Sequence, residues 1–308
     1  MKLATISSNP TVVEYAQGAA QDMTSKVADF LAPTVPVGTA VGHYKEYSSK
    51  SRFSLPDTLR SLGGRAVEIG FDATDATYNC QHHALDFPVD ILEQIEAEGL
   101  ENVFQEAADI CAEVGSLSHE KRVIDAAIDA LGAGTALAIG DADDVIDQLD
   151  AITLNIIKAA GYGGLMGVGF LFGAGAWRVV KNHPSVRDRF VSGSSAKFSN
   201  PNLNDFGDML VSKGESMIST LCYDTQPVGK AKALNFLLDG DIVIFARRSN
   251  PTRRDPSFMK TFRMRNQWMK PGSYSRDDGR VEVAKFDWSA DVKVTNSAAG
   301  VRKTVALG

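Results

Sequence analysis

The sequence has few cysteines and lacks the compact motifs that identify common catalytic sites. Its 308 residues include three cysteines, Cys80, Cys111 and Cys222, whose odd number and wide spacing predict reduced thiols rather than disulfide bonds. No phosphate-binding Gly-Lys-Ser/Thr loop, Gly-x-Ser-x-Gly elbow or His-Glu-x-x-His motif occurs in the chain. We therefore expect no catalytic residues, no cofactor and no enzymatic activity.

The chain has no excess of positive charge, with 32 Lys and Arg against 38 Asp and Glu. The formal net charge is −6 at pH 7, which does not favour a protein that coats nucleic acid. Residues 90–150 are acidic, with Lys121 and Arg122 as their only Lys or Arg, whereas residues 241–308 are basic. The basic segment is interleaved with aromatic residues that could stack on nucleic acid, namely Phe258, Phe262, Trp268 and Tyr274. We favour the alternative, in which the acidic and basic segments of different copies attract each other and guide assembly.

Long hydrophobic runs are nearly absent. Residues 159–177 are uncharged, but their many glycines indicate a buried helix, a turn at 161–164 and a strand rather than a membrane span. These glycines do not form a dinucleotide-binding fingerprint, because the cluster precedes a strand instead of following one. Residues 1–30 lack the basic head and apolar run of a signal peptide. We expect no membrane partner.

Cys80, His82 and His83 lie close together in the sequence, but we expect no metal site there. A structural zinc site needs about four ligands, and the other cysteines and histidines show no paired spacing. Neighbouring histidines on a strand also point to opposite faces. A cluster of aspartates at 141–144 opens a predicted helix, where negative charge usually stabilises the helix dipole.

One segment that is present poses a problem for a single folded chain. Residues 65–74 alternate strictly between apolar and polar or small side chains, which predicts a half-buried strand. Its expected partner is a strand at residues 43–47, reached through a loop that turns at Gly63 and Gly64. No second strong strand precedes this hairpin, and an isolated hairpin is marginal in water. We therefore expect an extended loop that contacts another copy of the chain through Val67, Ile69, Phe71, Tyr44 and Tyr47.

A long acidic helix is predicted next. Apolar residues recur at helical spacing from Leu100 to Val114 and again from Val123 to Leu131. They indicate either one helix over about 101–131 or two helices broken at 115–118, because Gly115 has a low helix propensity. A second helix is expected over 142–160, with Asp141 as its N-cap.

The rest of the chain contains both helical and strand periodicity. We expect strands over 166–172, 216–223, 241–246, 262–268 and 281–295, and helices over 175–181 and 204–211. Strands and helices interleave without a regular βαβ rhythm. The sequence therefore predicts an α+β fold rather than a doubly wound sheet.

The order of these segments resembles the major capsid proteins of tailed bacteriophages that share the HK97 fold. Segment 170–190, which contains Asn182-His183-Pro184, is similar to a strand, turn and helix of that family's A-domain. Segments 203–210 and 216–223 look like the helix and strand that follow, and 256–263, 276–278 and 292–300 look like the return to the P-domain. Upstream, segments 32–44 and 67–90 resemble the family's N-terminal arm, extended loop and entry to the spine helix.

This resemblance covers nearly the whole chain and implies an α+β, HK97-like capsid fold with four parts. They are an N-terminal arm at residues 1–40, an extended β-hairpin loop at 41–76, a P-domain, and an A-domain at 139–276. The P-domain would combine residues 77–138 and 277–308 and contain the spine helix at about 101–131. The start of the chain departs from the family because it lacks a long helical scaffold segment, so scaffolding is expected from a separate protein or from a removed segment.

The resemblance also implies a structural function without catalysis. Copies of the chain would form the pentamers and hexamers of an icosahedral head that encloses double-stranded DNA non-specifically. Separate scaffolding, portal and decoration proteins would be further partners. The protein would reside in the virion capsid and be assembled in the cytoplasm of a host bacterium. The alternatives are an encapsulin-type compartment shell, which encloses enzymes, a DNA-binding accessory protein, and an α+β enzyme, for which the sequence offers no coherent set of site residues.

Overall fold

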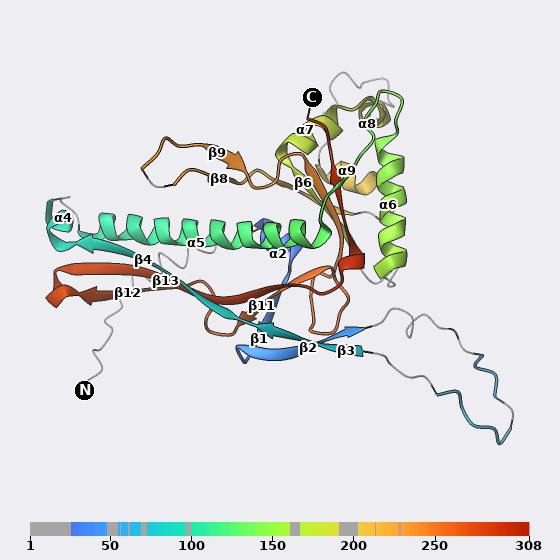
Figure 1. The fold of residues 1–308 in the computed structure, drawn as a ribbon, viewed down its shortest axis with the longest axis horizontal. Coiled ribbons are helices and arrows are strands. Elements are labelled where there is room, and N and C mark those ends of the chain that lie inside the picture. Colours follow the sequence, from blue (N-terminus) through green and yellow to red (C-terminus); the bar gives the residue numbers. More distant parts are fainter. Residues whose placement is uncertain are drawn as a thin grey trace.

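The computed structural model describes residues 26–47, 55, 57–60, 62–68, 73–96, 100–160, 167–190, 203–212, 214–227 and 229–307. Within these residues the chain forms two five-stranded sheets, two separate hairpins and a helix of 32 residues (Figure 1). This mixture of helices and strands confirms the predicted α+β class. None of the helices in the described ranges combines the length and the apolar character needed to cross a membrane.

The first sheet is built around β13 (Val281–Val294). β4 (Gln81–Asp90) pairs antiparallel with one edge of β13, while β12 (Lys270–Arg276) and β11 (Met259–Met264) pair in succession with its other edge. β1 (Thr34–Val37) adds parallel to β11. β11 ends before the predicted strand 262–268 does, because the chain leaves the ladder at a turn in which Asn266 adopts a left-handed conformation with φ 64°.

α5 (Leu100–Leu131) lies along this sheet as one continuous helix, and α4 (Ile91–Glu96) precedes it (Figure 1). The helix continues through Gly115, so the first of the two predicted alternatives is correct. Gly115 faces the sheet, and a Cβ at this position would lie 2.8 Å from two carbons of the Phe286 ring. Cys111 and Ala112 pack in the same cluster as Phe286 and Trp288. This close packing compensates for the low helix propensity of glycine.

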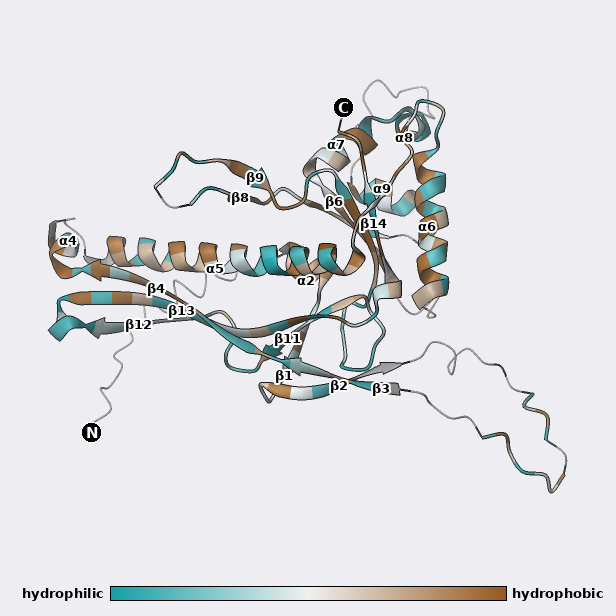
Figure 2. Ribbon diagram, in the orientation of Figure 1, coloured by the Kyte–Doolittle hydropathy of each residue, from teal (hydrophilic) through white to brown (hydrophobic). Residues whose placement is uncertain are grey.

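The second sheet has the strand order β5-β14-β10-β6-β7. Its strands are β5 (Thr135–Ala136), β14 (Gly300–Thr304), β10 (Asp241–Arg247), β6 (Gly167–Gly173) and β7 (Glu215–Ser219). The helices around it are α6 (Val145–Ala160), α7 (Ala174–Asn182), α8 (Pro184–Phe190) and α9 (Leu203–Met209). The sheet is rich in hydrophobic residues (Figure 2), and Phe170, Phe172 and Phe245 are fully buried in it.

The remaining elements are short. α2 (Lys26–Leu31) contacts α5, β2 (Val41–Tyr47) pairs with β3 (Ala73–Asn79), and β8 (Cys222–Asp224) pairs with β9 (Leu234–Phe236). Two 3-10 turns, η1 (Asp277–Gly279) and η2 (Ser297–Ala299), lie before and after β13.

Sheet membership divides the chain differently from the predicted domains. β11 and β12, which the prediction placed in the A-domain at 139–276, belong to the first sheet. β5 and β14, which it placed in the P-domain, belong to the second sheet. β13 pairs with β12 along its first part and with β11 along its last part, so both strands belong to the first sheet. The chain enters the second sheet only after η2, where β14 begins.

The predicted domain division stays a prediction, whereas the structure corrects two local predictions. α6 begins at Val145 rather than near 142, because Asp144 and not Asp141 is its N-cap. The Asp144 Oδ1 atom accepts hydrogen bonds from the backbone N–H groups of Ile146 at 3.0 Å and Asp147 at 3.2 Å. The predicted strand 216–223 is interrupted after Ser219, where the chain leaves the second sheet and β8 pairs with β9.

Gly115→Leu should destabilise the protein, because the new side chain would overlap the Phe286 ring and push α5 away from β13. We expect a loss of about 2–3 kcal/mol in the free energy of unfolding, a usual cost of overpacking a core. Ser118→Leu places the same side chain on the exposed face of the helix and should change this free energy by less than about 0.5 kcal/mol. Chemical denaturation measures both variants, and equal stabilities would contradict the close contact.

Candidate subunit interface

The stem of the extended loop is fixed to the first sheet by aromatic packing. β2 and β3 pair from Val41 opposite Asn79 to Tyr47 opposite Ala73. The Tyr78 ring stacks on the Phe262 ring of β11 with 4.7 Å between centroids, and the Tyr44 ring lies 5.3 Å from the same ring. These contacts hold the stem in place, and the described residues of the loop, 57–60 and 62–68, lie away from the body of the molecule (Figure 1).

The predicted hairpin is correct only at its base. The predicted partner 43–47 lies in β2, and its Tyr47 and Glu46 pair with Ala73 and Thr74 as expected. The second strand, however, is β3 at 73–79, and residues 65–68 of the predicted strand 65–74 lie in no strand. The predicted turn is present, since Gly63 has a φ of 79°. The register follows from the burial of Tyr44 and Tyr78 against Phe262, a tertiary contact that the local alternation of side chains does not report.

The five residues predicted to contact another copy fall into different surroundings. Val67 is 54% exposed on the loop. Tyr44 is buried within its own chain at 5% exposure, so it contributes to the subunit core. Ile69 and Phe71 lie outside the described residues, as does the side chain of Tyr47. The predicted contact of these residues with a second copy stays a prediction.

Exposed leucines on the same loop were missed by the sequence analysis. Leu55 is 97% exposed, Leu59 is 87% exposed and Leu62 is fully exposed. Hydrophobic residues are visible along the loop in Figure 2. Their signal in the sequence is that apolar residues recur in a segment whose Pro56 and Gly63 rule out a regular helix.

A second apolar surface lies at the opposite end of the molecule. On α4, Leu92 is 68% exposed and Ile95 is 59% exposed, and Phe87 of the neighbouring β4 is 37% exposed. Figure 1 places α4 and the extended loop at opposite ends of the long axis. Each subunit therefore presents apolar side chains at two separate ends that cannot cover each other within one chain.

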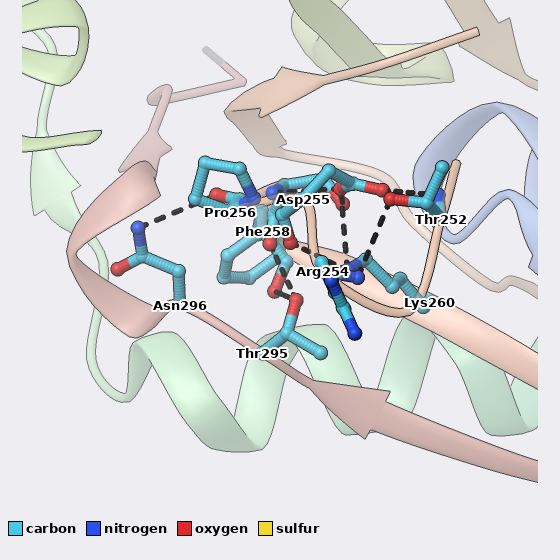
Figure 3. A network of polar contacts seen from close by, with 9 residues as sticks. Thr252, Arg254, Asp255, Pro256, Phe258, Lys260, Thr295 and Asn296 are labelled. Carbon is cyan, nitrogen blue, oxygen red and sulfur yellow. Dashed lines mark hydrogen bonds and ion pairs between the residues drawn. The ribbon is translucent and has the colours of Figure 1, made fainter. Parts of the chain in front are cut away.

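The connection between the two sheets is held by a buried polar network (Figure 3). Asp255 and Lys260 form an ion pair at 3.2 Å, and each side chain is 1% exposed. The Lys260 Nζ atom also donates to the Asp255 carbonyl oxygen at 2.5 Å, and the Asp255 carboxylate accepts hydrogen bonds from Thr252 and Ser257. Burial lowers the pKa of Lys260, and the carboxylate of Asp255 opposes this effect.

The network joins two of the three places where the chain passes between the sheets; the third runs from β4 through α5 to β5. Phe258, which lies between β10 and β11, accepts backbone hydrogen bonds from Thr295 and Asn296 at the end of β13. The Thr295 hydroxyl donates to the Ser257 carbonyl oxygen at 2.5 Å. Because two of the three crossings are tied at one place, the network helps to fix the relative orientation of the two sheets.

Three of the four aromatic residues of the basic segment pack inside the subunit, and the fourth, Tyr274, donates its hydroxyl to Asp86 at 2.9 Å. Phe258 and Phe262 are fully buried and Lys260 is paired inside the core. Trp268 packs edge-on against His119, with 5.1 Å between ring centroids. These side chains therefore serve the core of the subunit, and the structure does not support the stacking arrangement considered from the sequence.

Cys80 and the neighbouring histidines also take structural roles. The Cys80 thiol donates to the Phe262 carbonyl oxygen at 3.4 Å, and burial raises its pKa to about 11. His83 lies beside the Arg122 guanidinium. Across the ranges that the structure describes, no group of three or more His, Cys, Asp or Glu residues is arranged to hold a metal ion. The glycines at 161–166 lie outside the described residues.

Comparison with known sequences gives one short match. No protein-family model matches the chain. The major capsid protein of Pseudomonas phage JBD67 is 38% identical over 63 residues, which cover 20% of this chain and 20% of that protein.

Solved structures match over almost the whole chain. A phage-related protein from Bordetella bronchiseptica matches with a TM-score of 0.68 at 14% identity and covers 98% of both chains. The capsid of cyanophage P-SCSP1u has a TM-score of 0.58 at 9% identity, with 92% of this chain and 89% of that chain covered. An encapsulin from Synechococcus elongatus has a TM-score of 0.53 at 10% identity, with 100% and 93% covered. At these identities the likeness shows the fold alone.

Lys260→Met should destabilise the subunit strongly, because the Asp255 carboxylate would stay buried without its cation. Breaking a buried pair in this way costs about 3–5 kcal/mol of unfolding free energy. The double variant Lys260→Met/Asp255→Asn removes both charges and should recover about half of this loss or more. Denaturant titrations of the three proteins test this, and a single variant as stable as the wild type would contradict the structural role of the pair.

Proposed function

Because the chain has the HK97-like fold of phage capsid proteins, we propose that it is a major capsid protein. In this role, copies self-assemble into the pentamers and hexamers of an icosahedral head that encloses double-stranded DNA. The short match to a curated major capsid protein supports the proposal. The role is structural and involves no catalysis, and the assembled protein resides in the virion after assembly in a bacterial cytoplasm.

The observation that carries the proposal is the exposure of Leu55, Leu59 and Leu62 on a loop held away from its own core. An apolar surface of this kind indicates a contact with another molecule. The second apolar surface, on α4, lies at the opposite end of the subunit (Figure 1). A contact between unlike ends of successive copies is heterologous, and such contacts close into rings when the rotation permits.

The free energy of the apolar contact is consistent with assembly into a closed particle. Burial of three leucines contributes roughly 5–9 kcal/mol. This is comparable with the cost of about 4–15 kcal/mol for bringing two molecules together, so one contact by itself is weak. A subunit in a shell makes several contacts at once, and the later ones avoid most of that cost.

Charged residues on the subunit surface are consistent with assembly of several copies. Glu106 and Glu113 of α5 are exposed, and so are Arg253 and Arg254 in the basic segment. Attraction between these segments in different copies would orient the subunits as they meet. The net charge of −6 also suits a shell that encloses DNA without binding it tightly. Separate scaffolding, portal and decoration proteins are the further partners that we propose.

An encapsulin-type compartment is the second candidate. The likeness to an encapsulin over the full length of this chain favours it specifically, because such shells share the fold and the ability to assemble. The two candidates differ in what the shell encloses.

Leu59→Glu/Leu62→Glu should leave the subunit folded and prevent assembly. Both side chains are exposed in the single subunit, so their replacement removes no core contact, whereas an apolar contact with a neighbour would have to accept buried charges. Thr58→Glu is a matched control that adds charge to the same loop without removing an apolar side chain, and it should assemble. Size-exclusion chromatography and electron microscopy measure assembly, and normal particles from the double variant would contradict the proposed contact.

The contents of native particles distinguish the two candidate functions. A phage capsid should protect double-stranded DNA from added nuclease, whereas an encapsulin-type shell should contain protein cargo and little protected DNA. Nuclease treatment followed by gel electrophoresis and mass spectrometry of purified particles measures both contents. Particles that hold protein cargo in place of DNA would reject the capsid proposal in favour of the compartment.

A further inference from the structure

A buried acidic side chain lies where α2 docks on α5. Val27, Ala28, Phe30 and Leu31 of α2 are buried in the same core cluster as Val123, Ile124 and Ala127 of α5. Glu120 of α5 is only 3% exposed. Its carboxylate accepts hydrogen bonds from the backbone N–H groups of Val27 and Ala28. Glu120 is therefore a polar contact within an otherwise apolar docking surface.

The Glu120 carboxylate is not fully satisfied in this position. Its Oε2 atom is buried and has no hydrogen-bond partner among the described residues. A carboxylate that is buried with only part of its hydrogen-bonding capacity used is costly when ionised, and the neutral acid is less so. The docking of α2 should therefore depend on the charge state of this group.

We propose that Glu120 makes the docking of α2 sensitive to pH, so that protonation of its carboxyl group strengthens the contact with α5 and ionisation weakens it. Because α2 is the first described element, this contact determines how firmly the start of the described chain is held.

Charged groups of both signs surround the site. Asp29 of α2 adds negative charge beside Glu120 and so opposes its ionisation. Burial raises the pKa of Asp29 as well, and Arg263 of β11 and Arg247 of β10 partly oppose that shift. On α5 itself, the neighbours of Glu120 in sequence are His119 and Lys121, and the Lys121 ammonium is paired with Asp125 at 2.5 Å.

The direction of the pH effect follows from the pKa of Glu120. Burial raises this pKa from its ordinary value of 4.5 to about 7, although the two backbone hydrogen bonds act in the opposite direction. Since the docked state binds the proton more tightly than the undocked state, protonation favours docking. The stabilisation is complete below about pH 4.5 and is lost as the pH rises through about 7. Between pH 8 and pH 5.5, docking should tighten roughly 30-fold.

His119 responds to pH in the opposite direction and packs against a different element. It is 2% exposed and packs against Trp268 of the first sheet, and burial lowers its pKa to about 4. Acid therefore weakens the packing of α5 on the first sheet while it strengthens the docking of α2. Since the stability of the whole protein combines the two effects, the test has to follow α2 itself.

Hydrogen exchange of the α2 amides in the full-length protein measures this docking, after correction for intrinsic exchange rates. The wild type should show roughly 30-fold greater protection at pH 5.5 than at pH 8. Glu120→Gln, which cannot ionise, should lose most of this response, and what remains comes from Asp29, whose pKa burial also raises. Asp129→Asn, which removes an exposed carboxylate from the same helix, should keep the wild-type response. A wild type that does not respond to pH, or a response of the wild-type size in Glu120→Gln, would overturn the proposal.

A carbon-13 NMR titration of the Glu120 carboxyl group in the wild type decides the question if Glu120→Gln fails to fold. A midpoint near pH 7 supports the proposal, and a midpoint near pH 4.5 overturns it. Neither measurement requires a shell to form. The inference therefore succeeds or fails independently of the proposed capsid function.

Discussion

The close approach of α5 to β13 is the constraint on which the rest of the subunit depends. At Gly115 no side chain separates the helix from the Phe286 ring, so a helix of 32 residues can lie against a strand of 14 residues. A strand of that length pairs with β4 on one edge and with both β12 and β11 on the other. The result is an elongated first sheet, with α4 at one end and the stem of the extended loop at the other (Figure 1).

The buried pair of Asp255 and Lys260 extends this rigidity to the second sheet. Asp255 lies in the connection between β10 and β11 and Lys260 lies on β11, next to the point at which β13 leads into β14 (Figure 3). A buried ion pair is a weak source of net stability, but it accepts few alternative geometries. A subunit that repeats the same contacts around a shell needs this kind of fixed geometry, because each copy must present its two apolar ends at a constant distance and angle.

The sequence predicted the parts of this structure that local patterns determine. The apolar stripe of α5 has a helical period and β10 is a short continuous hydrophobic run. The order of the later segments was enough to indicate the HK97 fold. The pairing of β2 could not be predicted, because the burial of Tyr44 and Tyr78 against a ring more than 180 residues away selects the register. For the same reason the sequence did not reveal that Tyr44 is buried in its own chain. Leu55, Leu59 and Leu62 were missed because they recur at helical spacing in a segment whose described residues form no helix.

The most direct test of this account is a cryo-electron microscopy map of the assembled particle at side-chain resolution. The account predicts a closed shell in which the loop around Leu55, Leu59 and Leu62 lies on a neighbouring copy and these side chains are buried. A closed shell in which the loop contacts no neighbour would contradict it. A protein that remains a monomer under all conditions would contradict it as well.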